Sequence, residues 1–262
     1  MKKSISNIAW DAQSDEVMYE YLHRVGYDAL EIAPTRLCQD NPYDNIEISL
    51  EKVKYIKEYF NLEISSMQSI WFGRSERIFG NKNERDILIE YTKKAINYAK
   101  KIDCSNLVFG SPKNRIIDNQ DQRNIALEFF YSLGEIAKDN DTVISFEPNP
   151  VIYNTNFINN TEEAFQLVKE INSDGFRVNL DLGTVIWNRE DIKLIMNDIQ
   201  LINHIHISEP YLEKIEIKDI HYELSNALLN YGYEKYISIE MKDCGNIEEV
   251  KKIIKNVSGV IR

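Results

Sequence analysis

The feature that most restricts the fold of this chain is a regular alternation of short apolar runs with longer amphipathic segments. Eight runs are rich in β-branched residues: 4–10, 29–33, 62–70, 106–110, 143–147, 176–180, 202–207 and 236–240. Apolar residues at helical spacing follow the runs, over residues 15–25, 50–60, 84–102, 122–138, 162–171, 191–198, 217–231 and 247–257. Near-continuous apolar runs are typical of strands buried on both faces, and intervening helices make such strands parallel.

Eight strand–helix units predict a closed (β/α)8 TIM barrel of the α/β class. The 262 residues allow about 33 residues for each unit, and barrels of about 250 residues form one domain. The alternative is an open doubly wound sheet. A dinucleotide-binding sheet of that kind carries a GxGxxG turn after its first strand, and this chain has none. We therefore expect residues 1–262 to form a single domain.

Charge and cysteine usage exclude several classes of protein. The net charge of −11 argues against a nucleic-acid partner, because binding to phosphates relies on Lys and Arg. Three widely spaced cysteines without a CxxC pair argue against a disulfide framework or a Cys-rich zinc site. The N-terminus lacks the apolar run of a signal peptide, and no stretch approaches the roughly 20 apolar residues of a membrane helix. We expect a cytoplasmic protein without a membrane or nucleic-acid partner.

Polar residues gather where the predicted strands end, which is where function lies in a barrel of this kind. The terminal residues are Trp10, Glu31, Gln68, Gly110, Glu147, Asp181, His206 and Glu240. Acidic residues are depleted in buried strands, so a carboxylate at the end of four of the eight strands needs an explanation.

A shared cation explains the four potential ligands that end the fifth to eighth strands. We call these residues the quartet: Glu147, Asp181, His206 and Glu240. Neighbouring strands bring them to one half of the barrel mouth, where three unpaired carboxylates would repel one another. Three oxygen donors and one imidazole suit one divalent ion, either Mn²⁺, Mg²⁺, Co²⁺ or Zn²⁺. Separate rim ion pairs explain each residue alone, but not four in consecutive strands.

The HIHIS segment puts His204 and His206 on the same face of the seventh strand, because alternate residues of a strand point the same way. If that face is the barrel interior, His206 binds the metal and His204 lies one layer deeper. If it faces the helices, both are core residues. Glu209 in the following loop is expected to orient His206 or to contact substrate, and His221 to lie on a helix surface.

Five motifs carry a family resemblance over nearly the whole chain: GYDALEIAP, FEPNP, NLDLGT, HIHISEP and SIEMK, at the second and the fifth to eighth predicted strands. They resemble the xylose isomerase-like TIM barrels, and within them the sugar phosphate isomerase and epimerase group, which includes ketose 3-epimerases, hydroxypyruvate isomerase and inosose dehydratase. The resemblance implies that the quartet binds the metal. It also implies that Glu147 and Glu240 exchange protons on opposite faces of a carbon beside a carbonyl. A small carbohydrate substrate is implied as well, and a homo-oligomer is left open.

Three positions depart from the epimerase pattern. Thr184 stands where the family usually has a substrate-binding His, Leu212 replaces a substrate Arg, and Tyr153 replaces a Glu beside the metal site. The metal ligands are intact while the substrate contacts differ, which weakens the case for a free-ketose 3-epimerase. Two alternatives stay open: an inosose dehydratase-like lyase, which shares the first proton abstraction, and a non-catalytic sugar-binding barrel. An apurinic endonuclease would need more than the four histidines of this chain.

Further residues at the predicted mouth are candidates for substrate contacts: Trp10, Glu31, Gln68, Trp71, Lys113, Arg115, Asn149 and Glu209. The two tryptophans are expected to form a wall against the apolar face of a sugar, with core packing as the alternative. Lys113 and Arg115 are expected to hold a phosphate or carboxylate, with an exposed basic turn as the alternative. Glu31 and Gln68 are expected to contact hydroxyls, and Asn149 to face the pocket.

Overall fold

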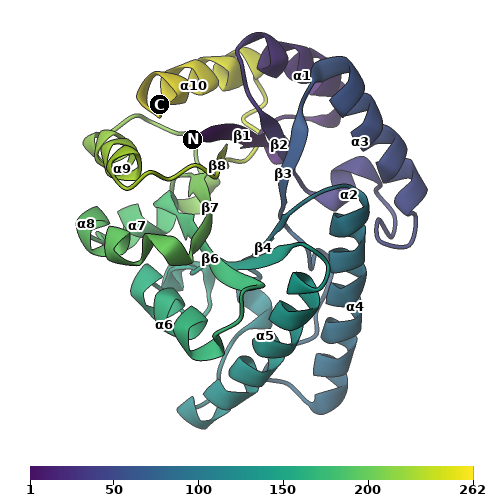
Figure 1. The fold of residues 1–262 in the computed structure, drawn as a ribbon, viewed down its shortest axis with the longest axis vertical. Helices are drawn as coiled ribbons and strands as arrows, with labels where there is room; N and C mark the ends of the chain where they lie inside the picture. Colours follow the sequence, from purple (N-terminus) through teal and green to yellow (C-terminus); the bar gives the residue numbers. More distant parts are fainter. Residues whose placement is uncertain (262) are drawn as a thin grey trace.

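The computed structural model, which describes residues 1–261, confirms the closed (β/α)8 barrel (Figure 1). All strands are parallel and pair in chain order, and β8 pairs with β1 to close the sheet. The strands are β1 (Lys2–Ser6), β2 (Ala29–Ile32), β3 (Glu63–Met67), β4 (Asn106–Phe109), β5 (Val143–Phe146), β6 (Phe176–Asp181), β7 (Ile202–Ile207) and β8 (Tyr236–Ile239).

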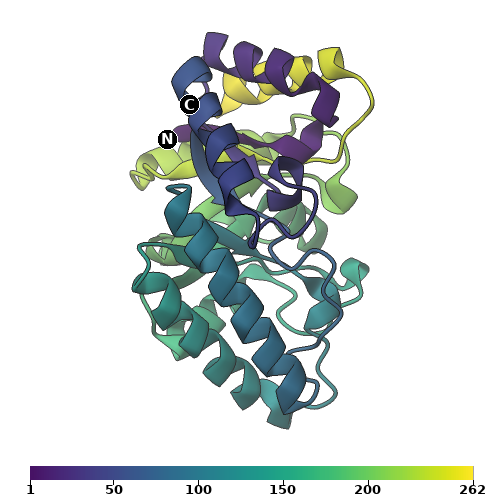
Figure 2. The same ribbon diagram turned by 90° about the vertical axis from the view of Figure 1, so that its right-hand side faces the viewer.

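Helices surround the strands, as the side view in Figure 2 shows, with α4 running across the outside of the barrel. The main helices are α1 (Asp15–Arg24), α3 (Ile46–Phe60), α4 (Lys82–Lys101), α5 (Arg123–Lys138), α6 (Thr161–Ile171), α9 (Asp219–Asn230) and α10 (Ile247–Val260). The predicted segment 191–198 is the short α8 (Ile192–Ile195), continued by the 3-10 turn η6 (Met196–Leu201). Two short helices, α2 (Pro34–Leu37) and α7 (Leu182–Asn188), were not expected.

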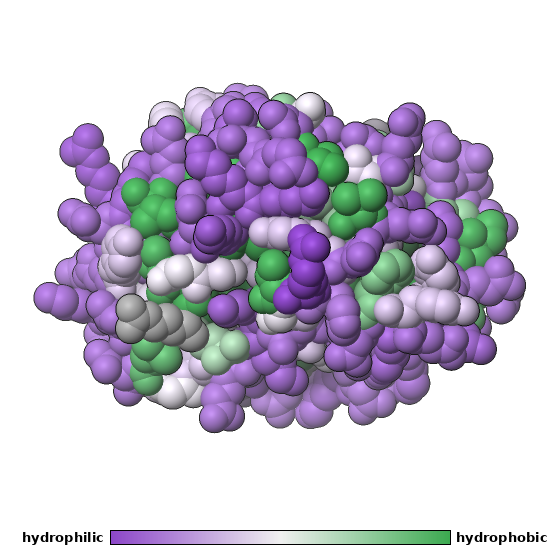
Figure 3. Space-filling view, turned by 90° about the horizontal axis from the view of Figure 1, so that it is seen from above, coloured by the Kyte–Doolittle hydropathy of each residue, from purple (hydrophilic) through white to green (hydrophobic). Residues whose placement is uncertain are grey.

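The apolar core lies between the strands and the helices. Phe130 of α5 packs against three strand residues, with ring centroids 5.1 Å from Phe109, 5.4 Å from Phe146 and 5.1 Å from Phe176. Because side chains alternate along a strand, an outward Phe146 directs the next residue, Glu147, inward. The surface seen in Figure 3 is mostly hydrophilic, with scattered hydrophobic residues. Among the described residues, no helix is both long and apolar enough to cross a membrane.

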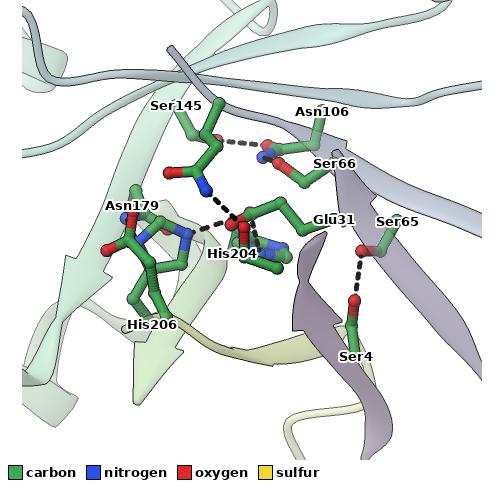
Figure 4. Close-up of polar contacts among 12 residues, drawn as sticks. Ser4, Glu31, Ser65, Ser66, Asn106, Ser145, Asn179, His204 and His206 are labelled. Carbon is green, nitrogen blue, oxygen red and sulfur yellow. Dashed lines mark hydrogen bonds and ion pairs between the residues drawn. The ribbon is translucent and has the colours of Figure 1, made fainter. Parts of the chain in front are cut away.

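The barrel interior is polar, whereas branched aliphatic side chains usually fill a TIM barrel. Asn106 Nδ2 donates to Ser66 Oγ at 2.8 Å, and Asn106 Oδ1 accepts from Ser145 Oγ. Figure 4 shows this group beside a second one, in which Glu31 meets the two histidines of β7. The polar layer therefore continues directly into the strand ends of the quartet.

The first strand ends four residues earlier than the sequence predicted. A 3-10 turn, η1 (Asn7–Ala9), follows Ser6 and accounts for the difference. Trp10 is buried beyond this turn, where its Nε1 donates to Asp15 Oδ1 at 2.8 Å and its ring meets Tyr19 edge-on. Trp10 is thus a core residue rather than the last residue of an inner strand.

Candidate metal centre

The carboxyl ends of β5 to β8 bring the quartet together. Asp181 and His206 are paired in the register of β6 and β7, and Glu147 and Glu240 directly follow β5 and β8. One donor atom of each of the four residues lies within 4.8 Å of every other. His206 Nδ1 is 3.0 Å from Glu147 Oε2 and 3.1 Å from Glu240 Oε2. The seventh strand therefore turns its histidines into the barrel.

The charges of the quartet fit a divalent cation. Burial raises the pKa of Asp181 to about 6, and the neighbouring Glu147 adds to the increase. Burial also raises the pKa of Glu240. For His206, burial lowers the pKa, but Glu240 and Glu31 outweigh burial and raise the pKa well above its ordinary value. Protons thus relieve the repulsion among the carboxylates, and a cation bound by three oxygens and one imidazole would relieve it in their place.

Glu31 orients the imidazole of His206. Its Oε2 lies 2.9 Å from His206 Nε2, and both side chains are fully buried. A carboxylate on one ring nitrogen fixes the tautomer and leaves the other nitrogen free to bind a metal. Glu31 therefore lies beneath the ligands, and not in the pocket where contacts to hydroxyls were expected.

His204 lies one layer below His206, as one of the two alternatives predicted. Its Nε2 lies 3.1 Å from Glu31 Oε2, an ion-pair distance. Among the described residues, neither ring nitrogen of His204 has a partner with hydrogen-bond geometry. Burial lowers the pKa of His204, and the neighbouring Glu31 carboxylate opposes this decrease.

Two asparagines hold both oxygens of Glu147. Asn149 Nδ2 donates to Oε1 at 2.9 Å, and Asn179 Nδ2 donates to Oε2 at 2.8 Å. The Asn179 amide also lies 3.2 Å from His206 Nδ1. Gly110 leaves room for this arrangement, because a Cβ there would lie 3.2 Å from Glu147 Oε1. The carboxylate is thus restricted to one orientation toward the other ligands.

Arg115 is fully buried and holds Asn149 in place through a hydrogen bond to its side chain. One NH2 nitrogen donates to Asn149 Oδ1 at 2.6 Å and to the Glu147 carbonyl at 3.0 Å. Its other nitrogens donate to the carbonyls of Gly110, Phe157 and Ile158. Burial lowers the pKa of Arg115 to about 9. The predicted phosphate or carboxylate contact does not fit this placement, because the guanidinium donors already bind protein acceptors.

Asp181 is held by the start of α7, a helix that the sequence did not predict. The backbone N–H and the hydroxyl of Thr184 donate to Asp181 Oδ2 at 2.7 and 2.8 Å. Ser208 Oγ donates to Oδ1 and accepts from the Gly183 N–H at 2.8 Å. Asp181 thereby caps α7, and an Asp three residues before a Thr at a strand end was the available signal. Thr184 is buried, so it positions Asp181 and does not line the pocket described below.

A cavity of about 240 Å³ opens above the quartet. Its lining residues are Glu147, Asp181 and Glu240, the polar Gln68, Ser69, Ser111, Asn149 and Tyr153, and Ile8, Val108, Gly110, Pro112 and Leu212. Ligand pockets are typically a few hundred Å³, so this one suits a small molecule. Of the predicted substrate contacts outside the quartet, Gln68 and Asn149 line this cavity.

Other predicted contacts lie elsewhere. Trp71 points toward the helices, where its Nε1 donates to Thr92 Oγ1 at 2.8 Å and its ring packs 4.6 Å from Phe109. The expected tryptophan wall is therefore absent from the lining residues. Lys113 is exposed outside the pocket. Glu209 is buried and pairs with Lys218 at 2.6 Å.

The expected surface position of His221 is wrong, because its side chain is buried. Its Nδ1 accepts from the Lys218 N–H at 3.2 Å at the start of α9.

A sequence profile described as xylose isomerase-like TIM barrel matches residues 19–258. The chain belongs to this family. The xylose isomerase-like resemblance of the five motifs is therefore confirmed. Among proteins with curated functions, none matches the sequence significantly.

Solved structures of several other proteins are similar over the whole chain. The 3-keto-D-glucoside 4-epimerase YcjR from E. coli has a TM-score of 0.80 at 16% identity, covering 99% of both chains. The D-psicose 3-epimerase from Clostridium cellulolyticum H10, solved with D-tagatose, has a TM-score of 0.81 at 15% identity, covering 100% of both chains. The IOLI protein with a bound zinc atom has a TM-score of 0.73 at 16% identity, covering 100% of this chain and 98% of that one. At these identities the likeness is one of fold.

Proposed function

We propose that this protein is a metal-dependent isomerase or epimerase of a sugar or sugar derivative, which moves a proton next to a carbonyl. The observation that carries the proposal is the convergence of the quartet at the floor of a small pocket. Two similar solved structures are named sugar epimerases, and a third holds zinc, which supports the same assignment.

The quartet would hold one divalent ion. Such an ion acts as a Lewis acid and stabilises the negative charge that develops on a substrate oxygen when the neighbouring carbon loses its proton. Glu31 keeps His206 Nδ1 directed at this position, and Ser208 and Thr184 do the same for Asp181. The buried polar layer thus pre-orients the ligands.

Glu147 and Glu240 would carry the proton. Both line the pocket, and they approach it from β5 and β8. A substrate carbon between the two carboxylates loses its proton to one of them and gains a proton from the other, which inverts the carbon. Asn149 and Asn179 hold Glu147 in place for this transfer.

Proton exchange in D₂O tests the proposal. The protein is loaded separately with Mn²⁺, Co²⁺, Mg²⁺ or Zn²⁺ and incubated with a panel of ketoses, aldoses and keto sugars. We expect deuterium at a carbon beside the carbonyl, and its loss after chelation or in the Glu147→Gln and Glu240→Gln variants. The matched control is Glu209→Gln, whose carboxylate pairs with Lys218 and does not line the pocket.

The products separate the remaining alternatives. A product lighter by one water identifies the inosose dehydratase-like lyase. Binding of metal and sugars without any exchange identifies a non-catalytic sugar-binding barrel and refutes the proposal.

A further inference from the structure

Resting on the proposed function, we infer that the substrate is an uncharged glycoside, with its sugar ring over the quartet and an apolar aglycone on an aromatic platform outside the pocket. We call Tyr153, Trp187 and Tyr211 the aromatic platform. The inference rests on the charged lining of the pocket, on its apolar lining residues and on the exposed rings that continue from it.

The charge of the pocket excludes anionic substrates. Three carboxylates line it, and among the described lining residues none is Lys or Arg. Arg115 uses its donors on protein acceptors, and Lys113 lies outside the lining. A phosphate or carboxylate on the substrate would meet like charge without a counter-charge.

Part of the pocket lining is apolar, and a sugar hydroxyl that faced it would have no partner. The apolar lining residues are Ile8, Val108, Pro112 and Leu212. A buried hydroxyl that finds no hydrogen-bond partner is costly, so these residues favour a substituent with few polar groups. Leu212 stands where the family resemblance implied a substrate-binding arginine. The change from a cation to an alkyl group alters both the charge and the polarity that the pocket accepts.

The loop that carries Leu212 has an unusual backbone. Tyr211 and Leu212 have φ values of 64° and 54°, a region that bulky residues rarely adopt. Three hydrogen bonds maintain it: Tyr211 N–H to the Tyr153 hydroxyl at 2.7 Å, Leu212 N–H to the Glu209 carbonyl at 3.0 Å, and Lys242 N–H to the Leu212 carbonyl at 3.0 Å. Backbone held in such a region is concentrated at ligand sites. Here it turns Leu212 toward the pocket and leaves Tyr211 exposed.

The aromatic platform continues from the pocket to the surface. Tyr153 lines the pocket, its ring centroid lies 6.0 Å from that of Tyr211, and the Tyr211 centroid lies 6.0 Å from that of Trp187. Tyr211 is 52% exposed and Trp187 44% exposed. Contiguous exposed aromatic side chains mark binding surfaces, and their faces pack against apolar rings. Because the platform is continuous with the pocket through Tyr153, the group that packs on it is the outer part of the ligand bound in the pocket.

A glycoside also sets a chemical requirement on the sugar ring. The glycosidic carbon of an aldose is an acetal and not a carbonyl, so proton abstraction needs a ketone elsewhere on the ring. Oxidation of a ring hydroxyl to a ketone, by a dehydrogenase with its own electron acceptor, is therefore the class of reaction that must supply this substrate.

Ligand binding to the Mn²⁺-loaded protein tests the inference. Isothermal titration calorimetry compares phenyl glucoside, methyl glucoside, glucose and glucose 6-phosphate, with both anomers of each glycoside. We expect phenyl glucoside to bind about tenfold more tightly than methyl glucoside, and glucose 6-phosphate at least tenfold more weakly than glucose. Trp187→Ala should remove the preference for phenyl, while Tyr59→Ala, a 71% exposed aromatic on α3, should leave it unchanged. Leu212→Arg should improve binding of glucose 6-phosphate.

Two results would overturn the inference. Glucose 6-phosphate binding as tightly as glucose would contradict the charge argument. A Trp187→Ala variant that keeps the phenyl preference but changes its sedimentation coefficient would assign the platform to contact between two copies of the chain. Deuterium exchange in D₂O is measured on the same Mn²⁺-loaded protein with the ketoses, aldoses and keto sugars of the activity panel, so an active enzyme without a glycoside preference is distinguished from failure of the proposed function.

Discussion

Replacement of Glu31 by Gln tests whether the polar barrel interior prepares the metal centre. Glu31 Oε2 lies 2.9 Å from His206 Nε2, and no part of either side chain reaches solvent. Glutamine has nearly the same volume, so the variant removes one charge and one strong acceptor without opening a cavity. The imidazole then loses the partner that fixes its tautomer and directs Nδ1 toward the carboxylates.

The expected loss is confined to metal binding. Removal of a carboxylate that supports a ligating histidine lowers metal affinity about 10- to 100-fold, which is roughly 1.4–2.7 kcal/mol. Isothermal titration of the metal-free protein with Mn²⁺ measures the dissociation constant, and a chelator in competition extends the range to tight binding. Circular dichroism verifies that the variant is folded.

The control for Glu31→Gln is Glu209→Gln, which removes another buried carboxylate. Glu209 pairs with Lys218, so the metal affinity of this variant should stay within about threefold of the wild type. An unchanged affinity in Glu31→Gln would refute the orienting role of Glu31. An equal loss in both variants would mean that the total charge of the barrel, and not the contact with His206, sets the affinity.

Three further predictions concern the residues around the quartet. Arg115→Met leaves several buried carbonyls without donors and should lower the free energy of unfolding by about 3–5 kcal/mol in urea titrations, whereas the exposed Lys113→Met should have no effect. Because Asp181 has a pKa of about 6 and His206 a raised pKa, both must release protons to bind metal, so affinity should rise steadily between roughly pH 5 and pH 8; a flat profile would contradict this. Thr184→Val removes the hydroxyl bond to Asp181 and should weaken Mn²⁺ binding about tenfold, which Thr184→Ser should restore; equal affinities of all three proteins would refute it.

The architecture and the quartet could be predicted because both depend on short-range patterns. Strands buried on both faces require apolar runs, and parallel strands in chain order place their carboxyl ends side by side. Glu147, Asp181, His206 and Glu240 occupy consecutive strand ends, and the structure brings one donor atom of each within 4.8 Å of the others. The spacing of His204 and His206 predicts that both side chains lie on the same face of β7. Only the assembled barrel shows that this face is the interior.

Residues outside the strands were harder to place, because the direction of a loop side chain depends on segments far away in the sequence. Arg115 faces inward because it binds the carbonyls of Phe157 and Ile158, about forty residues later. Trp71 faces the helices because Thr92 of α4 accepts its N–H. Trp10 does not lie at the barrel mouth, because β1 ends at Ser6 and a 3-10 turn follows. The partners of Arg115 and Trp71 lie far away in the sequence, whereas the turn that displaces Trp10 directly precedes it.

The amino-acid pattern by itself therefore determined the barrel, the order of its strands and the residues able to hold a cation. Periodicity of side chains along a strand is a property of the backbone, and it needs no knowledge of the neighbours. Packing of the closed barrel decided what surrounds those residues: Glu31 beneath His206, Asn149 and Arg115 behind Glu147, and an uncharged, partly apolar pocket wall at Leu212. These contacts join residues from different strands and loops, so they exist only after the chain has closed on itself.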